Sequence, residues 1–222
     1  KIELDKFGSF ILNDTRAAPR HFDIDTSFNN NCSPKSASRK NGKIESVLSF
    51  SGGIDSTAGL LLELDRNKTP LSLCVGFGQK NEKDELRVVK KISTKLNIDV
   101  KKIHLNFKEY VDSGWSRWKL GIIPARNYLF ASLAANLINK STDTDSRILI
   151  CAHKEEITPV NTDKSEYFFE TSSKIFSKYY KRNVSVETPF RWFTKPEIVS
   201  VWHRKWEKKF KLKPQDTVSC YF

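Results

Sequence analysis

The 222-residue chain contains 38 Lys and Arg against 26 Asp and Glu, which gives it a formal net charge of +12 at pH 7. Hydrophobic residues make up 38% of the sequence and include 15 Phe and 5 Trp, enough to fill the core of one α/β domain. No apolar run is long enough to cross a membrane, the first residues lack the apolar segment of a signal peptide, and the 4 cysteines form no C-x-x-C pair. These features exclude membrane proteins and disulfide scaffolds, and we expect a reduced, cytoplasmic protein.

The excess of positive charge bears on the partners of the chain. It suits the binding of nucleic acid or another polyanion, and it equally suits a basic surface that meets an acidic protein. Charge alone does not choose between these two partners. A homodimer is also compatible with the sequence, and no membrane partner is expected.

The first 43 residues differ in composition from the rest of the chain. Residues 1–26 carry two short apolar patches with turn-forming residues between them, and we interpret them as a short N-terminal extension. Residues 27–43 are rich in Asn, Ser and Lys, with almost nothing to bury, as in a polar linker or mobile loop. The sequence therefore predicts one main domain over residues 44–222.

From residue 44 onward, short apolar segments alternate with amphipathic ones. The expected strands are 46–50, 71–75, 100–105, 147–152 and 184–186. The expected helices are 55–67, 82–97, 125–139, 165–181 and a last one that begins at a capping box over 194–197. In the helix over 165–181 we expect Phe168, Ile175, Phe176 and Tyr179 to face inward. This alternation is typical of βαβ units and predicts an α/β, Rossmann-like fold, a parallel sheet of about five strands with helices on both faces.

The first expected strand ends in the sequence S-G-G-I-D-S-T at 51–57, which then enters a helix. A glycine pair lets consecutive backbone N–H groups face an anion, and the helix adds its unpaired N–H groups and the positive end of its dipole. We expect Asp55 to hold Mg²⁺ on the bound phosphates. The other phosphate contacts are expected from Ser51, Gly52, Gly53, Ser56 and Thr57. The alternative is an ordinary turn with Asp55 as a helix cap, but the strand before it and the helix after it favour a phosphate loop.

This string resembles the S-G-G-x-D-S signature of the PP-loop ATP pyrophosphatases, which split ATP between its α and β phosphates to adenylate a substrate. It differs from the G-x-x-x-x-G-K-[ST] loop because no Lys follows the glycines. Later segments resemble one branch, the QueC family of 7-cyano-7-deazaguanine synthases. These segments are F-G-Q at 77–79, P-A-R-N at 124–127, C-A-H-K-E-E-I at 151–157, T-P-F-x-x-x-T-K-P-E-I at 188–198 and V-S-C-Y at 218–221.

The resemblance implies an adenine nucleotide alpha hydrolase-like fold and the ATP-dependent activation of a carboxylate on a 7-deazaguanine base. Ammonia then converts the activated carboxylate to an amide, and a second ATP-dependent step gives a nitrile. The implied cofactors are ATP and Mg²⁺, and the implied enzyme type is an AMP- and pyrophosphate-forming ligase. A PP-loop enzyme that modifies tRNA and a non-catalytic ATP-binding subunit are the alternatives.

The resemblance also implies roles for residues in the matching segments. The implied catalytic residues are Asp55, which would hold Mg²⁺, and Arg126 and Lys195, which would neutralise phosphate charge. The nucleotide would be bound by the phosphate loop together with Gln79 and Arg126, and the base by Asn127, Glu155 and Glu156.

Each of these residues also has a purely structural interpretation. Arg126 could be a surface cation, although the start of a helix is an unfavourable place for positive charge. The capping box alone would account for the sequence around Lys195. Gln79 and Asn127 could serve as turn and cap residues, and the acidic pair at 155–156 could face solvent with only one member functional.

The end of the chain departs from the family pattern. QueC proteins bind a structural zinc through the cysteine of the S-C-Y segment and a later C-x-x-C-x-x-C cluster. Cys220 matches the first of these ligands, and the chain stops two residues later. We therefore expect that the zinc lobe is either truncated here or absent, because one thiolate cannot form a tetrahedral zinc site. A buried structural cysteine is the alternative.

The N-terminal extension resembles QueC-like proteins that occur with added segments in bacterial anti-phage defence clusters. That resemblance implies the modification of a base or of a protein partner within a defence complex. The basic, aromatic segment from His203 to Lys213 could contact nucleic acid. The spacing of Ile198, Trp202 and Trp206 instead favours the inward face of an amphipathic helix.

Overall fold

The computed structural model describes residues 44–79, 81–105, 125–138, 145–158 and 163–218. Within these residues five short strands form one sheet, and every neighbouring pair of strands is parallel. The strands are β1 (Ser46–Ser49), β2 (Leu71–Gly76), β3 (Val100–His104), β4 (Ser146–Leu149) and β5 (Val184–Glu187). The predicted parallel sheet is confirmed.

The strands lie in the order β3-β2-β1-β4-β5, with β1 at the centre. Val47 of β1 lies opposite Leu71 of β2 on one side and opposite Ile148 of β4 on the other. The strand order therefore reverses between β1 and β4. In open parallel sheets this reversal opens a crevice at the carboxyl ends of the two strands, and ligands bind there. The segments that follow β1 and β4 are the expected location of a site.

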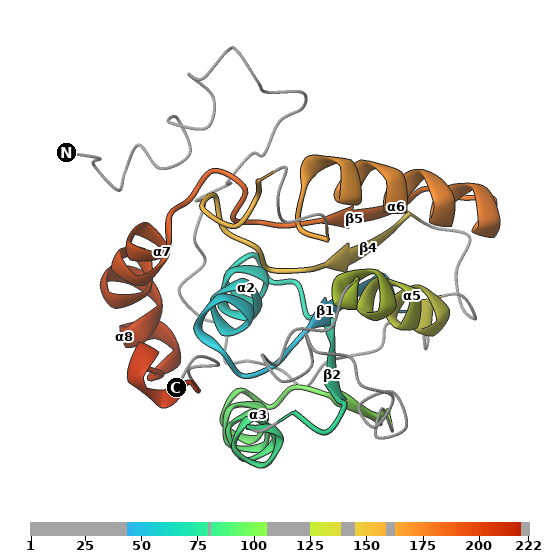
Figure 1. Ribbon diagram of the computed structural model, residues 1–222. Coiled ribbons are helices and arrows are strands. Elements are labelled where there is room, and N and C mark those ends of the chain that lie inside the picture. Colours follow the sequence, from blue (N-terminus) through green and yellow to red (C-terminus); the bar gives the residue numbers. More distant parts are fainter. Residues whose placement is uncertain (1–43, 80, 106–124, 139–144, 159–162, 219–222) are drawn as a thin grey trace. The chain divides into compact units, whose positions relative to one another are not determined.

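Helices cover both faces of the sheet, as predicted. The longer helices are α2 (Ile54–Asp65), α3 (Glu82–Leu96), α5 (Arg126–Ile138) and α6 (Glu166–Tyr180). Figure 1 shows α2 and α3 on one side of the strands and α5 on the other. Neighbouring residues of β1 follow this division, because Val47 packs among residues of α5 and α6 whereas the next residue, Leu48, lies against Gly59 of α2. A sheet covered on both faces needs such continuous apolar strands.

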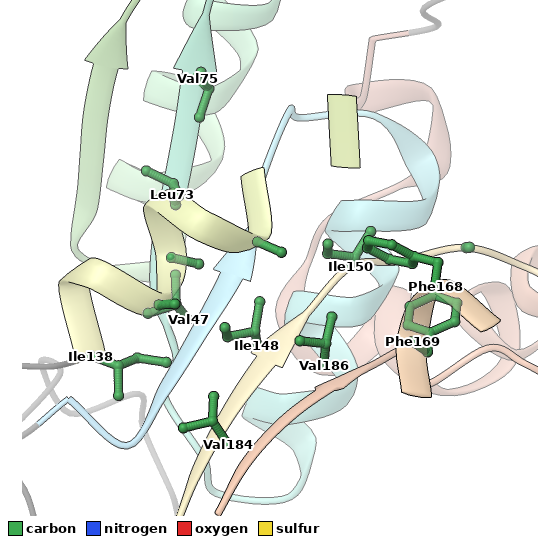
Figure 2. Close-up of a cluster of buried hydrophobic side chains, with 14 residues drawn as sticks. Val47, Leu73, Val75, Ile138, Ile148, Ile150, Phe168, Phe169, Val184 and Val186 are labelled. Carbon is green, nitrogen blue, oxygen red and sulfur yellow. The ribbon is translucent and has the colours of Figure 1, made fainter. Parts of the chain in front are cut away.

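The core on the α5 and α6 side is drawn in Figure 2. Val47, Ile148 and Val186 of the strands share this cluster with Phe168 and Phe169 of α6. The buried residues of α5 in the cluster are mainly small, which lets the helix lie close to the strands: Ala131, Ala134, Ala135 and Ile138. Full burial of one large apolar side chain contributes about 1.5–3 kcal/mol, so this cluster holds β1 and β4 firmly in position.

One expectation about α6 is wrong. Ile175 and Tyr179 were predicted to face inward, but their exposed fractions are 55% and 75%. The helix is rotated because Ser173 and Ser177 face β5, where their hydroxyl oxygens accept backbone N–H bonds at 2.8 and 2.9 Å. β5 is an edge strand of the described sheet, so some of its N–H groups have no neighbouring strand to bond to and need such acceptors. Apolar spacing could not reveal this polar contact.

The C-terminal helical segment begins as predicted and then changes its winding. It consists of α7 (Lys195–Val201), the π-helical turn η4 (Trp202–Trp206) and α8 (Glu207–Phe210), followed by the 3₁₀ turn η5 (Pro214–Asp216). Glu197 Oε2 accepts hydrogen bonds from both the backbone N and the Oγ1 of Thr194 at 2.8 Å, which confirms the capping box. Trp202 and Trp206 are buried, as the amphipathic interpretation predicts. No helix in the described part of the chain has the length and apolar character of a membrane span.

Asp65, at the end of α2, clamps this segment in place. Its carboxylate pairs with Lys205 at 2.8 Å and with Lys209 at 2.6 Å, and it accepts a hydrogen bond from Trp206 Nε1 at 3.3 Å. Burial raises the pKa of Asp65, but the hydrogen bonds and charges of the two lysines outweigh burial, so the pKa lies below its usual value of 3.8. The clamp fixes the segment whose first residue is Lys195.

Candidate active site

The turn between β1 and α2 has the geometry of an anion-binding loop. Gly52 has a φ of +76°, a left-handed conformation that favours glycine. Within the turn, Ser51 N donates to Ser56 Oγ, and Gly53 N donates to Ser51 Oγ, both at 3.3 Å. Bonds of this length are weak, so the loop N–H groups can turn to a better acceptor such as a phosphate oxygen.

Two backbone contacts hold the loop from either side. Thr57 N donates to Gly53 O at 2.9 Å in the first turn of α2, and Val218 N donates to Gly52 O at 3.0 Å. Thr57 itself is fully buried, and its hydroxyl has no hydrogen-bond partner among the described residues. The segment that leads toward Cys220 thus runs beside the loop. Cys220, the expected zinc ligand, lies outside the described residues.

Asp55 and Lys195, 140 positions apart in the sequence, meet next to this loop. Asp55 lies in the first turn of α2, and its Oδ2 accepts a hydrogen bond from Lys195 Nζ at 3.3 Å. The other oxygen, Asp55 Oδ1, is buried and has no hydrogen-bond partner among the described residues. α7 delivers the lysine because its capping box begins the helix at this position. The pair combines a cation with a carboxylate whose second oxygen makes no hydrogen bond to the described residues.

The segment after β4 is held beside Asp55 by the segment after β5. Thr188 Oγ1 accepts from Ala152 N at 3.1 Å and donates to Ala152 O, while Lys154 N donates to Phe193 O at 2.8 Å. His153 and Phe190 form an isolated parallel bridge. These contacts extend the pairing of β4 with β5 beyond the sheet and set the position of residues 153–156.

Residues 153–156 direct one imidazole and one carboxylate toward the site. His153 is only 7% exposed, and its Nε2 lies 3.6 Å from Glu156 Oε2. Glu156 Oε1 pairs with Lys164 Nζ at 2.5 Å. The side chain of Glu155 is 55% exposed, and its Oε2 accepts from Lys195 N at 3.3 Å. The two glutamates therefore differ, since only Glu156 is largely buried in the cluster.

Burial and charge act in opposite directions on the ionisable groups here. Burial raises the pKa of Glu156, but Lys164 and His153 lower it more, so the pKa of this carboxyl lies below its usual value. Burial, together with the charges of Asp55 and Glu63, raises the pKa of Cys151 well above its usual value. Glu156 is thus an anion at neutral pH, and Cys151 stays a thiol.

Gln79, expected at the nucleotide, is held by contacts within its own region. Its Oε1 accepts from Phe77 N at 2.9 Å, and its Nε2 donates to Glu85 Oε2 at 2.8 Å. Glu85 is a buried residue of α3. The amide therefore ties the loop after β2 to α3, as the turn interpretation describes, and its nucleotide contact stays a prediction.

Arg126 and Asn127 begin α5 at the same edge of the sheet. Asn127 is buried, its backbone N donates to Asp163 Oδ2, and its Nδ2 donates to Asp163 O, both at 3.0 Å. The Arg126 guanidinium lies 5.8 Å from the ring centroid of Phe130, and no carboxylate in the described part of the chain forms an ion pair with it. Asn127 thus anchors the helix start, while the charge of Arg126 has no carboxylate partner among the described residues.

The predicted residues fall into two groups. Asp55, Lys195, Glu155 and Glu156 come together around His153, whereas Gln79, Arg126 and Asn127 lie at the ends of β2 and α5. No hydrogen bond or ion pair of the described residues joins the two groups. His153 and Lys164 were not predicted, although a histidine directly after a buried strand is a signal that could have identified the first.

The fold and the loop together define a class. A parallel Rossmann-like sheet whose central strand ends in S-G-G-I-D-S, at the reversal of strand order, is a nucleotide-binding domain of the PP-loop type. The chain matches the family model described as "Queuosine biosynthesis protein QueC" over residues 45–222 and belongs to this family. It is therefore an ATP-using, ligase-type enzyme of the 7-cyano-7-deazaguanine synthase family.

Individual relatives are distant. The chain is 26% identical to a 7-cyano-7-deazaguanine synthase of Polynucleobacter asymbioticus, over 83% of this chain and 81% of that protein. It is 27% identical to the enzyme of the same name from Methanocaldococcus jannaschii, over 80% and 84%. Among solved structures, NMN synthetase from Francisella tularensis shares the fold, with a TM-score of 0.51 at 12% identity over 78% of this chain and 64% of that one.

Proposed function

We propose that this enzyme adenylates a carboxylate on a 7-deazaguanine base and then transfers ammonia to it, giving an amide and, after a second ATP-dependent step, a nitrile. The observation that carries the proposal is the contact between Lys195 Nζ and Asp55 Oδ2 at the mouth of the phosphate loop. It brings a cation and a metal-binding type of side chain to the point where the phosphates of ATP would lie. Membership of the QueC family supports the choice of substrate.

The protein groups act mainly by charge. The loop N–H groups and the start of α2 hold the phosphates, and Ser51 and Ser56 supply hydroxyl donors. Lys195 and Arg126 stabilise charge that develops on the α-phosphate while a carboxylate oxygen of the substrate bonds to phosphorus and pyrophosphate leaves. Asp55 Oδ1, buried and without a hydrogen-bond partner in the described part of the chain, fits a Mg²⁺ ligand. Bound there, Mg²⁺ would neutralise phosphate charge.

The second half of the reaction needs the acyl adenylate to meet ammonia away from water. Ammonia attacks the activated carbonyl carbon, the bond from that carbon to the phosphate oxygen breaks, and AMP leaves. Glu155 is the better candidate for the amino edge of the base, because Glu156 is already paired with Lys164. A carboxylate accepts hydrogen bonds from the two N–H groups of a guanine-like edge.

The proposal is tested by incubating the protein with ATP, Mg²⁺, ammonia and candidate carboxylates and measuring AMP and pyrophosphate by mass spectrometry. We expect AMP only when 7-carboxy-7-deazaguanine is present, and none from the Asp55→Ala variant. Asp84→Ala, which removes an exposed carboxylate of α3, serves as the matched control and should keep full activity. AMP formed with tRNA but with no deazaguanine would favour a tRNA-modifying enzyme, and ATP binding without turnover would favour a non-catalytic subunit.

A role in anti-phage defence extends the same proposal. It rests on the N-terminal extension, which lies outside the described residues and precedes the segment matched by the family. In such a role the activated base would be joined to another base or to a protein partner. The protein partner, nucleic-acid binding and a homodimer stay predictions.

A further inference from the structure

Three side chains around the reversal point bring metal-binding atoms together. Asp55, His153 and Glu156 each offer one ligand atom, and these atoms all lie within 4.8 Å of one another. Asp55 comes from the first turn of α2, whereas the other two come from the segment after β4. A metal ion with bonds of about 2.1 Å needs only small side-chain rotations to draw such a set together.

Two polar atoms of this cluster are poorly satisfied. Asp55 Oδ1 is buried and has no hydrogen-bond partner in the described part of the chain. His153 is 7% exposed, and its Nδ1 makes no hydrogen bond to the described residues but lies 3.3 Å from Glu155 Oε2, a contact that is an ion pair only when the imidazole is protonated. A buried polar atom without a hydrogen bond costs stability, and a bound cation would remove that cost.

The nearby charges favour a cation. In each carboxylate of the cluster one oxygen pairs with a lysine, since Lys195 pairs with Asp55 Oδ2 and Lys164 with Glu156 Oε1, while Glu156 Oε2 accepts a long bond of 3.4 Å from His153 N. With Glu155 beside His153, three carboxylates face two lysines. Within this set the negative charges exceed the positive ones, and the imidazole adds a nitrogen atom that can bind a metal.

We infer that Asp55, His153 and Glu156 form a site for a divalent transition-metal ion, such as Co²⁺, Mn²⁺ or Zn²⁺, in preference to Mg²⁺. The reason is the imidazole nitrogen, which suits transition metals, whereas Mg²⁺ is bound mostly by oxygen and water. Only one part of the inference rests on the proposed function, namely that the ion would lie beside the phosphates of ATP. The ion would be bound by the protein before nucleotide arrives, and at Asp55 it would take the place proposed above for Mg²⁺.

The test is a Co²⁺ titration of the metal-free chain without nucleotide, followed by visible absorption, which reports the donor atoms. Co²⁺ also separates this site from one formed by cysteines, because thiolate ligands add strong sulfur-to-metal bands. We expect one Co²⁺ per chain without those bands, and little displacement by a tenfold excess of Mg²⁺.

The decisive variant is His153→Asn, which replaces a nitrogen donor with an amide oxygen at similar size. We expect the Co²⁺ affinity to fall at least tenfold while Mg²⁺ affinity is unchanged or higher. A merely structural histidine would alter both alike. His104→Asn is the matched control, because His104 also pairs with a glutamate, Glu82, but lies outside the cluster. It should bind Co²⁺ as the parent chain does.

Several results would overturn the inference. They are no Co²⁺ binding, sulfur-to-metal bands, displacement by an equal concentration of Mg²⁺, or equal affinity in the His153→Asn and His104→Asn variants. If His153→Asn does not fold, Glu156→Gln should show the same tenfold loss. Because the titration contains no ATP or base, its failure leaves AMP formation to be judged separately, and the failure of AMP formation leaves the metal site standing.

Discussion

At the scale of single residues, the site depends on a contact that is partly exposed to water. The side chains of Lys195 and Asp55 are 39% and 22% exposed, and ion pairs of this kind contribute about 0–1 kcal/mol to stability. The start of α7 is stabilised instead by the capping box, which is formed by the neighbouring residues Thr194 and Glu197. Charge and capping can therefore be tested separately.

Lys195→Met should lower AMP formation about 10²- to 10³-fold, because it removes a cation aimed at developing charge. Its melting temperature should match that of the parent chain. Glu197→Ala should do the reverse, costing about 1 kcal/mol of stability through the lost cap with a much smaller effect on turnover. Steady-state kinetics and thermal melts of both variants measure this, and a Lys195→Met variant with full turnover would contradict a role for this cation in AMP formation.

At this scale, motifs formed by neighbouring residues could be predicted from the sequence. Contacts between residues that are distant in the sequence could not. The phosphate loop and the capping box could be predicted because each is complete within seven residues or fewer. The site position of His153 depends on contacts between the segments after β4 and β5, which no local pattern contains. Gln79 and Asn127 were assigned by resemblance, and their bonds to Glu85 and Asp163 likewise come from the fold.

At the scale of elements, α2 connects the site to the rest of the domain. Gly59, in the middle of this helix, faces the end of β4 so closely that a Cβ there would lie only 2.3 Å from Cys151 Sγ. An alanine in an ordinary helix position would add about 1 kcal/mol of stability. Here the close approach of helix and strand reverses that expectation.

Gly59→Ala should destabilise the protein by about 1–3 kcal/mol through overpacking. In a chain that already carries Cys151→Ala, the same substitution should cost much less, because the sulfur atom is gone. Urea unfolding of the parent, both single variants and the double variant gives the coupling energy. Additive effects would contradict the close contact between α2 and the segment after β4.

The clamp at Asp65 makes a prediction about pH. The pKa of Asp65 is lower in the folded protein than its usual 3.8, so its contribution to stability is complete above that value and is lost as the pH falls through the folded-state pKa. Asp65→Asn should therefore destabilise the chain at about pH 7 and by less at about pH 3. Urea unfolding at the two pH values tests this, and an equal loss at both would contradict the ion pairs with Lys205 and Lys209.

The helical elements also show what spacing can and cannot predict. The end of α7 could not be placed, because nothing in residues 202–206 distinguishes a π turn from continued α-helix before the contact with Asp65 is known. The rotation of α6 depends on serines that bond to an edge strand, so Ile175 and Tyr179 were assigned to the wrong face.

At the scale of the whole molecule, the sheet and the covering of its faces follow from the sequence. Five apolar segments separated by helices long enough for crossovers predict a parallel sheet, and the right-handed crossover leaves few strand orders. The order β3-β2-β1-β4-β5 then brings the ends of β1 and β4 together, so the phosphate loop and residues 153–156 become neighbours. The identity of the base could not be derived from these physical arguments and came from family resemblance.

The central claim, that a carboxylate of the base attacks the α-phosphorus of ATP, is tested most directly by an oxygen label. The protein is incubated with ATP, Mg²⁺, ammonia and 7-carboxy-7-deazaguanine whose carboxylate carries ¹⁸O, and the AMP is analysed by mass spectrometry. The account predicts AMP that contains one ¹⁸O, because the carboxylate oxygen stays on phosphorus when ammonia displaces AMP. Unlabelled AMP, or label in inorganic phosphate with ADP as the other product, would contradict it.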